Sequence, residues 1–446
     1  MQKSSNIVKT KKNIATNNKT FGVVNDGKTH IIEAIKALES DDLIILLNEN
    51  LDKYSTMRVG GVASVVALPK SFTAILRVLD VVKQKNLPYY ILGNGSNTLC
   101  SSKGFDGVVI CTRFMNKISL QSNLYKPVHY KKNIICNGEN TKKRENSAFI
   151  LQNKIFFQKN INLQTKQNLN NNEILPKCGL LKKTTLTVFA ECGALLPQIS
   201  KRVCDLGYAG FEFACGIPAS CGGAVKMNAG AFGGQMADIV SRVLIFNTKT
   251  CSLYYKINEK IIKKYDFLRK KCKKYAKCVQ NTGFLQNELD LTNGCDFCLE
   301  NNFCESYKAD YRKTNIDDCE FIIGAELIFQ RGHKADIQKK RAENIKNRIA
   351  TQNVGYPSLG SVFKRSGKFI PSAFIDKSGL KGLTLGGAQV SKVHAGYIVN
   401  RGNATSDDIL KLLKFLQYYI CKKSNIVVQY ELKFLGDHNE EKQKFS

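Results

Sequence analysis

The sequence predicts a globular chain of mixed α/β or α+β class, and three observations support this assignment. Between residues 63 and 97, apolar runs alternate as strand, helix and strand, the order of a βαβ unit. A strand-like run followed by a helix-like run recurs at 184–207. The last part of the chain, 407–436, reads as a helix followed by a strand. The 446 residues are enough for two or three domains.

The N-terminal half is predicted element by element from its apolar spacing. In residues 30–50, Ile31, Ile35 and Leu38 lie at helical spacing, so one amphipathic helix or a pair of helices is expected there. The next elements are expected as strands at 63–69, 89–92, 104–112 and 184–192, and as helices at 71–86, capped by Ser71, and 195–207, stopped by Gly207.

The C-terminal half begins with a predicted strand at 320–330 and a charged helix at 333–352. We expect a domain boundary near Gln330. The predicted organisation is a basic tail over 1–30, a first domain over 31–330 and a second over 331–446. Two Lys/Asn-rich segments, about 115–183 and 249–308, lack regular apolar spacing and are predicted to be irregular insertions in the first domain.

The charge and the cysteines restrict the class of protein. A formal net charge of +30 favours anionic partners, but much of it lies in dispersed lysines that are typical of a solvated surface. The first 25 residues lack a signal-peptide core and, having no arginine, support an organelle transit peptide only weakly. No run of 18 apolar residues suggests a membrane span. We therefore expect a cytoplasmic protein without a membrane partner, whose sixteen cysteines are free thiols.

The second insertion contains a CxxC pair, Cys295 and Cys298, with Cys272, Cys278 and Cys304 nearby. A zinc knot requires four ligands at suitable spacing, and these positions fit no fixed spacing well. Reduced thiols without a metal are the preferred interpretation, and the zinc knot is the alternative.

Two glycine-rich stretches are candidates for a ligand site. The first, LGNGSN at 92–97, follows a predicted strand, so its backbone amides are able to approach a phosphate. By itself it also reads as a simple turn, and it is not the GxGxxG fingerprint. The second, from Gly210 to Gly234, is almost uncharged and allows close backbone packing around a flat or phosphorylated ligand. Together they predict a cofactor site.

These motifs resemble those of one family, the UDP-N-acetylenolpyruvoylglucosamine reductases of peptidoglycan synthesis (MurB). The resemblance covers most of the chain outside the two insertions, and its motifs run in the family's order. They are STMRVGG (55–61), LGNGSN (92–97), GIPASCGGAVKMNAGAFGG (216–234), YR (311–312), PSLGSVFK (357–364), GLKGLTLGGAQVSKVHAGYIVN (379–400) and YELKFLG (430–436). The chain looks like the family's shorter subtype, enlarged by insertions.

The resemblance implies an α+β fold with an FAD-binding domain of the vanillyl-alcohol-oxidase (PCMH) type, followed by a smaller α+β substrate-binding domain. It implies FAD as the cofactor and NADPH as the hydride donor. The residues that match the family's FAD-binding segments are Thr56, Arg58, Gly93, Asn94, Gly95, Ser96, Asn97, Pro218, Gly222, Gly223, Asn228 and Gly230.

The implied activity is reduction of enolpyruvyl-UDP-N-acetylglucosamine to UDP-N-acetylmuramate, a step in cell-wall synthesis on which cell shape and division depend. Arg312, Ser361 and Glu431 match the family's catalytic positions. Hydride addition to the enolpyruvyl β-carbon builds enolate charge, so the reaction needs a cation beside the carboxylate and a proton donor for the α-carbon. Arg312 suits the first role, Ser361 the second, and Glu431 is expected near the arginine.

Other residues and other functions remain open at this level. Tyr356, Lys364 and Arg365 flank Ser361 and are candidates for contact with the diphosphate of the substrate or of NADPH. His394 is interpreted as a structural histidine. One alternative function is another FAD-dependent oxidation or reduction on the same scaffold. A second is a non-enzymatic basic protein that binds nucleic acid. We expect no nucleic-acid partner, and the sequence does not determine the oligomeric state.

The chain departs from the family pattern at two positions. Ala219 stands where the family has glycine, and Thr314 stands where serine is common. If position 219 required a positive φ, the alanine Cβ would be unfavourable and would weaken flavin binding.

Overall fold

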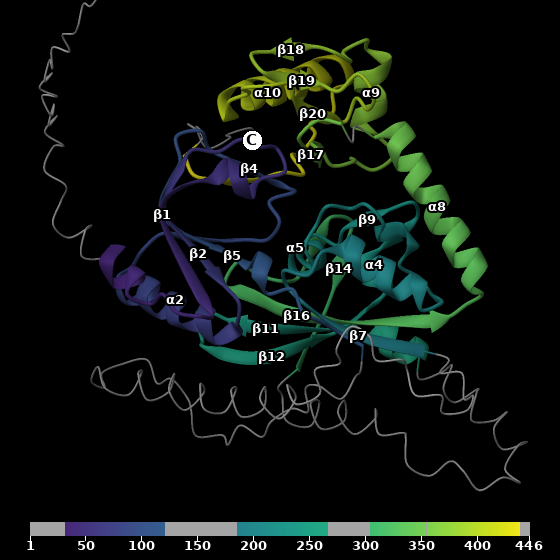
Figure 1. Ribbon diagram of the computed structural model, residues 1–446. Coiled ribbons are helices and arrows are strands. Elements are labelled where there is room, and N and C mark those ends of the chain that lie inside the picture. The colour runs from purple at the N-terminus through teal and green to yellow at the C-terminus, as the bar shows by residue number, and fades with distance from the viewer. Residues whose placement is uncertain (1–31, 121–184, 266–303, 353–354, 438–446) are drawn as a thin grey trace, which may run out of the picture.

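The computed structural model describes residues 32–120, 185–265, 304–352 and 355–437 (Figure 1). Residues 32–36 and 259–265 are also helical. The helices with full bounds are α2 (Phe72–Gln84), α4 (Leu196–Asp205), α5 (Cys221–Lys226), α8 (Lys334–Thr351), α9 (Pro371–Lys377) and α10 (Ser406–Ser424). In Figure 1, two sheets form the lower part of the molecule, the C-terminal elements lie above them, and α8 runs up one side.

The first sheet has four strands, in the order β1 (Leu43–Asn50), β2 (Val62–Pro69), β5 (Phe105–Cys111) and β3 (Tyr89–Leu92). β2, β5 and β3 are parallel, and β1 is antiparallel to β2. Helix α2 connects β2 to β3, which confirms the predicted βαβ unit. Its N-cap is Ser71, whose hydroxyl accepts the Ala74 amide at 3.0 Å.

The predicted helix or helix pair at 30–50 is wrong in its second half, because residues 43–50 form strand β1. Leu43 and Ile45 are buried and Ile44 is only half-buried, which is the period-two pattern of a strand. A turn at 41–42 separates this strand from the short helix before it. Pairing with β2 makes residues 43–50 a strand, although the residues before them have helical spacing.

The second sheet is larger and mostly antiparallel. Its strands, in spatial order, are β13 (Cys304–Ser306), β12 (Ser252–Ile257), β11 (Val240–Asn247), β16 (Glu320–Arg331), β7 (Thr185–Glu191) and β6 (Ile118–Ser119), with β8 (Tyr208–Ala209) also paired to β16. The strands predicted at 184–192 and 320–330 are confirmed as β7 and β16. In the core between the sheets, Phe72 of α2 meets Phe246 of β11 with ring centroids 5.5 Å apart.

The irregular segments predicted at 115–183 and 249–308 are wrong at their edges. β6, β12 and β13 lie inside these ranges and extend the larger sheet at both ends. The lysines and tyrosines of β12 obscure its alternation in the sequence, and antiparallel pairing with β11 determines its structure. Residues 121–184 and 266–303, which include the CxxC pair, lie outside the described residues.

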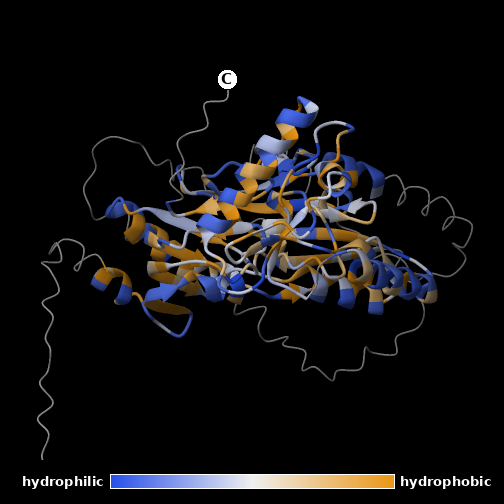
Figure 2. Ribbon diagram, turned by 90° about the horizontal axis from the view of Figure 1, so that it is seen from above, coloured by the Kyte–Doolittle hydropathy of each residue, from blue (hydrophilic) through white to orange (hydrophobic). Residues whose placement is uncertain are grey.

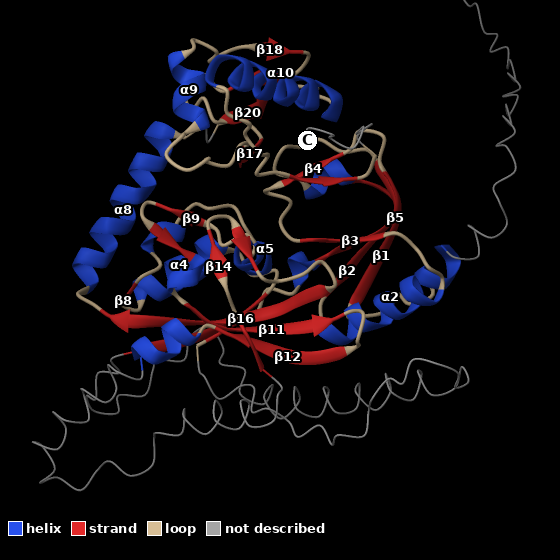
Figure 3. Cartoon of the chain, turned by 180° about the vertical axis from the view of Figure 1, so that it is seen from behind, coloured by secondary structure: helices blue, strands red, loops and turns tan. Residues whose placement is uncertain are grey.

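The C-terminal elements form a second core. Strands β17 (Ser358–Ser361), β20 (Tyr397–Asn400), β19 (Ala388–Val390) and β18 (Thr384–Leu385) form a sheet in this order. Helices α9 and α10 pack on it, as Figure 3 shows from behind. Met57, Val59 and Leu99 from the N-terminal half also belong to this core. The predicted division near Gln330 stays a prediction.

The strand predicted to follow the helix within 407–436 is only partly correct. Only β21 (Lys433–Leu435) is a strand, and it pairs in parallel with β4 (Thr98–Cys100) from the other end of the chain. Two short hairpins complete the described strands: β9 (Gly230–Ala231) with β10 (Gly234–Gln235), and β14 (Ala309–Asp310) with β15 (Lys313–Thr314). The return of residues 433–435 to β4 brings the end of the described chain to the glycine loop that precedes β4.

The hydropathy of the ribbon follows this layering. Seen from above in Figure 2, many strands are orange, and the helices carry both hydrophobic and hydrophilic residues. All cysteines that the structure describes are free thiols. No helix in the described ranges is long and apolar enough to cross a membrane.

Candidate active site

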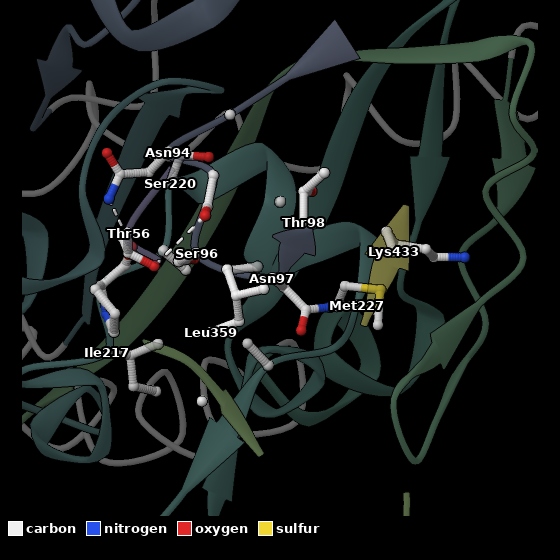
Figure 4. A pocket seen from close by; sticks show the side chains of 18 of the residues that line it. Thr56, Asn94, Ser96, Asn97, Thr98, Ile217, Ser220, Met227, Leu359 and Lys433 are labelled. Atoms are coloured by element: carbon white, nitrogen blue, oxygen red, sulfur yellow. Dashed lines mark hydrogen bonds between the residues drawn. The ribbon is translucent and has the colours of Figure 1, made fainter. Parts of the chain in front are cut away.

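A cavity of about 1210 Å³ lies between the glycine-rich loops and the C-terminal elements. Most of the predicted site residues line it: Thr56, Gly93, Asn94, Gly95, Ser96, Asn97, Pro218, Gly222, Gly223, Gly230, Arg312, Tyr356, Ser361, Arg365 and Glu431. In Figure 4, the side chains of Thr56, Asn94, Ser96 and Ser220 lie on one side of this cavity, and those of Thr98, Met227 and Lys433 lie on the other.

The first glycine loop, residues 93–97, connects β3 to β4. Gly95 has φ +61°, and a Cβ at this position would lie 2.0 Å from the Tyr54 carbonyl oxygen. A Cβ at Gly93 would lie 2.3 Å from the Ser220 hydroxyl oxygen of the second glycine loop. Glycine is therefore needed at Gly95, where the loop packs against backbone, and at Gly93 it leaves room for the Ser220 side chain.

The second glycine loop, residues 216–223, leads into α5. The Asn94 side-chain amide donates to the Pro218 carbonyl at 2.7 Å, which joins the two loops. A Cβ at Gly222 would lie 2.9 Å from the Cys192 Cβ. The two glycine loops thus form a narrow cradle of backbone with few charged side chains. This arrangement fits the diphosphate and the flat ring of FAD, which backbone amides and small residues accommodate.

Arg312 and Glu431 form an ion pair in the cavity wall. Arg312 Nε donates to Glu431 Oε1 at 2.7 Å, although 119 positions separate the two residues. The Arg312 side chain is 21% exposed and that of Glu431 12%, so the pair is largely withdrawn from water. The expected proximity of the two residues is therefore present in the structure.

Backbone carbonyls hold the rest of the arginine head group. Arg312 Nη1 donates to Asn228 O at 3.3 Å, and Nη2 donates to Gly230 O at 3.0 Å. A guanidinium has five N–H donors, so one on each Nη atom is left for a ligand. Arg312 itself has φ +52°, an uncommon conformation for a non-glycine residue and one that clusters at functional sites.

The pKa of Glu431 is raised above its ordinary value. Burial is the largest cause, and it is opposed by the positive charges of Arg312, Lys364 and Arg365. Burial also lowers the pKa of His394, which lines the same cavity. The His394 Nδ1 accepts the Gly396 amide at 3.1 Å, a bond that fits the structural role expected for this histidine.

Ser361 ends strand β17, where this strand pairs with Tyr397 of β20. A register shift separates Ser358 from Ser361, and Gly360 within it has φ +77°. The glycine thus permits the bulge that brings the serine to the cavity wall. The Thr56 hydroxyl donates to the Ser358 carbonyl at 2.7 Å, which ties this strand to the motif at 55–61.

Three predicted site residues do not line the cavity. The Asn228 side chain is buried, donating to Gln235 Oε1 at 3.0 Å and to Asp310 O at 2.9 Å, while its own carbonyl supports Arg312. Arg58 and Lys364 also lie outside the lining. Their proposed contacts with cofactor or substrate stay predictions, as do those of the lining residues.

Several residues that line the cavity were not predicted from the sequence. Arg348 and Gln352 lie four positions apart at the end of α8 and both face the cavity. The Tyr397 hydroxyl donates to Gln352 Oε1 at 3.0 Å. Lys433 lies two positions after Glu431 and lines the same cavity. The spacing of Arg348 and Gln352, and that of Glu431 and Lys433, is visible in the sequence. Whether these side chains face the site depends on the fold.

Both family departures are accommodated. Ala219 is not among the left-handed residues of the described chain, so its Cβ meets no backbone penalty and the expected weakening has no basis here. Thr314 donates its hydroxyl to the Lys226 carbonyl at 2.8 Å. Among the described residues, no group of three or more His, Cys, Asp or Glu side chains is placed to hold a metal ion.

Known proteins resemble this chain in both halves. Residues 63–128 match the FAD binding domain family, and residues 352–435 match the C-terminal domain of UDP-N-acetylenolpyruvoylglucosamine reductase. A relative of that name from Caldanaerobacter subterraneus is 28% identical over 394 residues, covering 88% of this chain and 94% of the relative. One from Clostridioides difficile is 28% identical over 407 residues, covering 91% and 97%.

A solved structure supports the fold. The UDP-N-acetylenolpyruvylglucosamine reductase (MurB) from Thermus caldophilus matches with a TM-score of 0.53 at 22% identity, covering 88% of this chain and 98% of that one. Together with the glycine cradle, these matches define an FAD-dependent oxidoreductase with the predicted α+β fold. The chain belongs to the UDP-N-acetylenolpyruvoylglucosamine reductase (MurB) family.

Proposed function

We propose that this protein uses NADPH and FAD to reduce enolpyruvyl-UDP-N-acetylglucosamine to UDP-N-acetylmuramate. The observation that carries the proposal is the Arg312–Glu431 pair, which lies in the wall of the cavity that the glycine loops also line. Two relatives that bear the name of this activity match the chain over 94% and 97% of their own length. A cytoplasmic location and the absence of a nucleic-acid partner are part of the proposal.

The cavity residues would divide the work of the reaction. The two glycine loops would hold FAD, which would provide the hydride-transfer chemistry between NADPH and the enolpyruvyl β-carbon. The two remaining N–H groups of Arg312 would bind the substrate carboxylate and stabilise the enolate charge. The Ser361 hydroxyl would then give its proton to the α-carbon, which the developing negative charge makes strongly basic. Glu431 would hold Arg312 in place through the 2.7 Å bond.

The basic groups near Ser361 are candidates for the substrate's diphosphate. Arg365 and Tyr356 line the cavity, and Arg401 stacks over the Tyr356 ring at 4.2 Å. Lys364 lies beside them in the chain and contributes positive charge at Glu431. Positively charged groups at a cavity would increase its rate of encounter with a negatively charged diphosphate ligand.

A flavin spectrum and two half-reactions test the proposal. The purified protein should be yellow, and NADPH should bleach the flavin in the absence of oxygen. Adding the enolpyruvyl substrate should then restore the oxidised spectrum with formation of UDP-N-acetylmuramate. A colourless protein that does not reconstitute with FAD, or a reduced flavin that the substrate never reoxidises, would overturn the proposal.

A serine variant separates this function from another FAD-dependent reaction on the same scaffold. Ser361→Ala should slow reoxidation by the enolpyruvyl substrate about 10²–10⁴-fold, the usual contribution of a general acid. Reduction of the flavin by NADPH should be unchanged, because that step needs no proton from Ser361. Equal rates of substrate reduction in wild type and variant would exclude Ser361 as the proton donor.

A further inference from the structure

Glu431 lies on a segment that is bonded along both edges. We call residues 429–435 the bridging segment. On one edge, the Glu431 amide donates to the Val362 carbonyl at 2.8 Å, and the Lys364 amide donates to the Gln429 carbonyl at 2.9 Å. These bonds tie the segment to the residues that follow Ser361.

The other edge of the bridging segment meets the first glycine loop and β4. The Lys433 amide donates to the Asn97 carbonyl at 2.9 Å, and β21 continues in parallel register with β4. The Ser101 amide donates to the Leu435 carbonyl at 2.8 Å. The bridging segment therefore fixes the distance between the glycine loop on one side and the serine strand on the other.

Asn97 binds the bridging segment twice. Besides its carbonyl bond to Lys433, its side-chain amide donates to the Glu431 carbonyl at 3.0 Å. A carbonyl accepts only, so the amide nitrogen of Asn97 must be the atom that faces it. Figure 4 shows Asn97 within the cavity, between the cluster of Thr56 and Ser96 and the side that carries Lys433. Its side-chain donor is directed to the backbone carbonyl of Glu431.

Asn94 in the same loop makes a different contact. Its side chain donates to the Pro218 carbonyl of the second glycine loop, and so closes the cradle itself. The two asparagines lie three positions apart, have the same chemistry and each bind one backbone carbonyl. One joins the two glycine loops, and the other joins a glycine loop to Glu431.

We propose that Asn97 is a positioning residue for the reduction of the substrate and that its side chain is not a flavin ligand. By fixing the carbonyl of Glu431, it holds the carboxylate at Arg312 Nε and so orients the guanidinium. This inference rests on the proposed function. It predicts that loss of the Asn97 amide affects the substrate half-reaction and spares both flavin binding and flavin reduction.

The test compares Asn97→Ala, Asn97→Asp and Asn94→Ala in the full-length holoenzyme by flavin content and anaerobic stopped-flow absorbance. In both Asn97 variants, flavin content and reduction by NADPH should stay within about twofold of wild type. Reoxidation by the enolpyruvyl substrate should slow about 10- to 100-fold, because the part-buried Glu431 carbonyl loses its donor and the glutamate no longer holds Arg312 in a fixed position. Asn97→Asp keeps the shape but lacks the N–H group, so it should show the same loss. Asn94→Ala should instead lower the flavin content.

A second measurement needs neither flavin nor substrate turnover. Hydrogen–deuterium exchange of the peptide covering residues 429–435 should be faster in the Asn97 variants than in wild type, with unchanged exchange in α2. Loss of flavin from the Asn97 variants, a parallel decrease in both half-reactions, or unchanged exchange in the bridging segment would overturn the inference. If wild type fails to turn over the enolpyruvyl substrate, the proposed function fails, and the exchange experiment still decides whether Asn97 holds this segment.

Discussion

The two sides of the cavity are built in different ways. The glycine loops, residues 93–97 and 216–223, shape their surface largely with backbone, and at Gly95 an added Cβ would lie 2.0 Å from a backbone oxygen. The opposite wall depends on three side chains, Arg312, Ser361 and Glu431, which come from separate parts of the chain. Each loop of the first side is local in sequence, whereas the second side exists only after folding.

This difference suggests a division of function. A rigid backbone surface suits a cofactor that stays bound, because backbone amides do not need to be ordered by other side chains. Charged side chains suit the reacting end of a substrate, because their charge acts directly on the developing enolate. Damage to the glycine backbone of the first side should therefore remove the flavin, and damage to the second should leave the flavin but stop the reaction.

The largest effect is expected from Gly95→Ala. The new Cβ would collide with the Tyr54 carbonyl, and alanine disfavours φ +61°. We expect a protein that retains little flavin and is destabilised by more than about 2 kcal/mol, measured by the ratio of flavin to protein absorbance and by thermal unfolding.

Gly233→Ala is the matched control for this change. Gly233 also has a positive φ, +80°, but nothing lies within 4 Å of the added Cβ. It should cost only the conformational penalty of about 1–2 kcal/mol and retain the flavin. Equal flavin loss in both variants would mean that backbone strain, and not the close approach of the loops, explains the effect at Gly95.

An intermediate effect is expected from Arg312→Lys. Lysine keeps the positive charge but cannot donate simultaneously to Glu431, to the carbonyls of Asn228 and Gly230, and to a substrate carboxylate. Reoxidation of reduced flavin by substrate should fall about 10²–10³-fold, while the flavin spectrum and its reduction by NADPH persist. A variant that loses flavin instead would show that the two sides of the cavity are not independent.

The smallest effect is a dependence of stability on pH. Because burial raises the pKa of Glu431, the folded state holds this proton to a higher pH than the unfolded chain does. The stability contributed by the protonated group is complete below the unfolded pKa of about 4.5 and is lost as pH rises through the raised folded pKa. Denaturant unfolding should show wild type losing stability relative to Glu431→Gln across this range. A constant difference between the two proteins would contradict the raised pKa.

The predictions from sequence succeeded where a local rule decides the structure. The Ser71 cap and the βαβ alternation each depend on a few neighbouring residues. They failed at β1 and β12, where pairing with a neighbouring strand outweighed the apparent spacing or composition. They also missed Arg348, since no local signal shows which face of α8 meets the cavity.

By itself, the sequence determined the class of fold, the two glycine loops and, through the order of its motifs, the family. These properties are carried by the identity of consecutive residues, and a glycine has the same conformational freedom wherever the chain places it. The family motifs led us to expect Glu431 near Arg312, but only the tertiary structure decided the bond between them and the bond from Asn97 to the glutamate's backbone. Contacts across more than a hundred positions depend on strand pairing and helix packing throughout the molecule, which no short stretch of residues encodes.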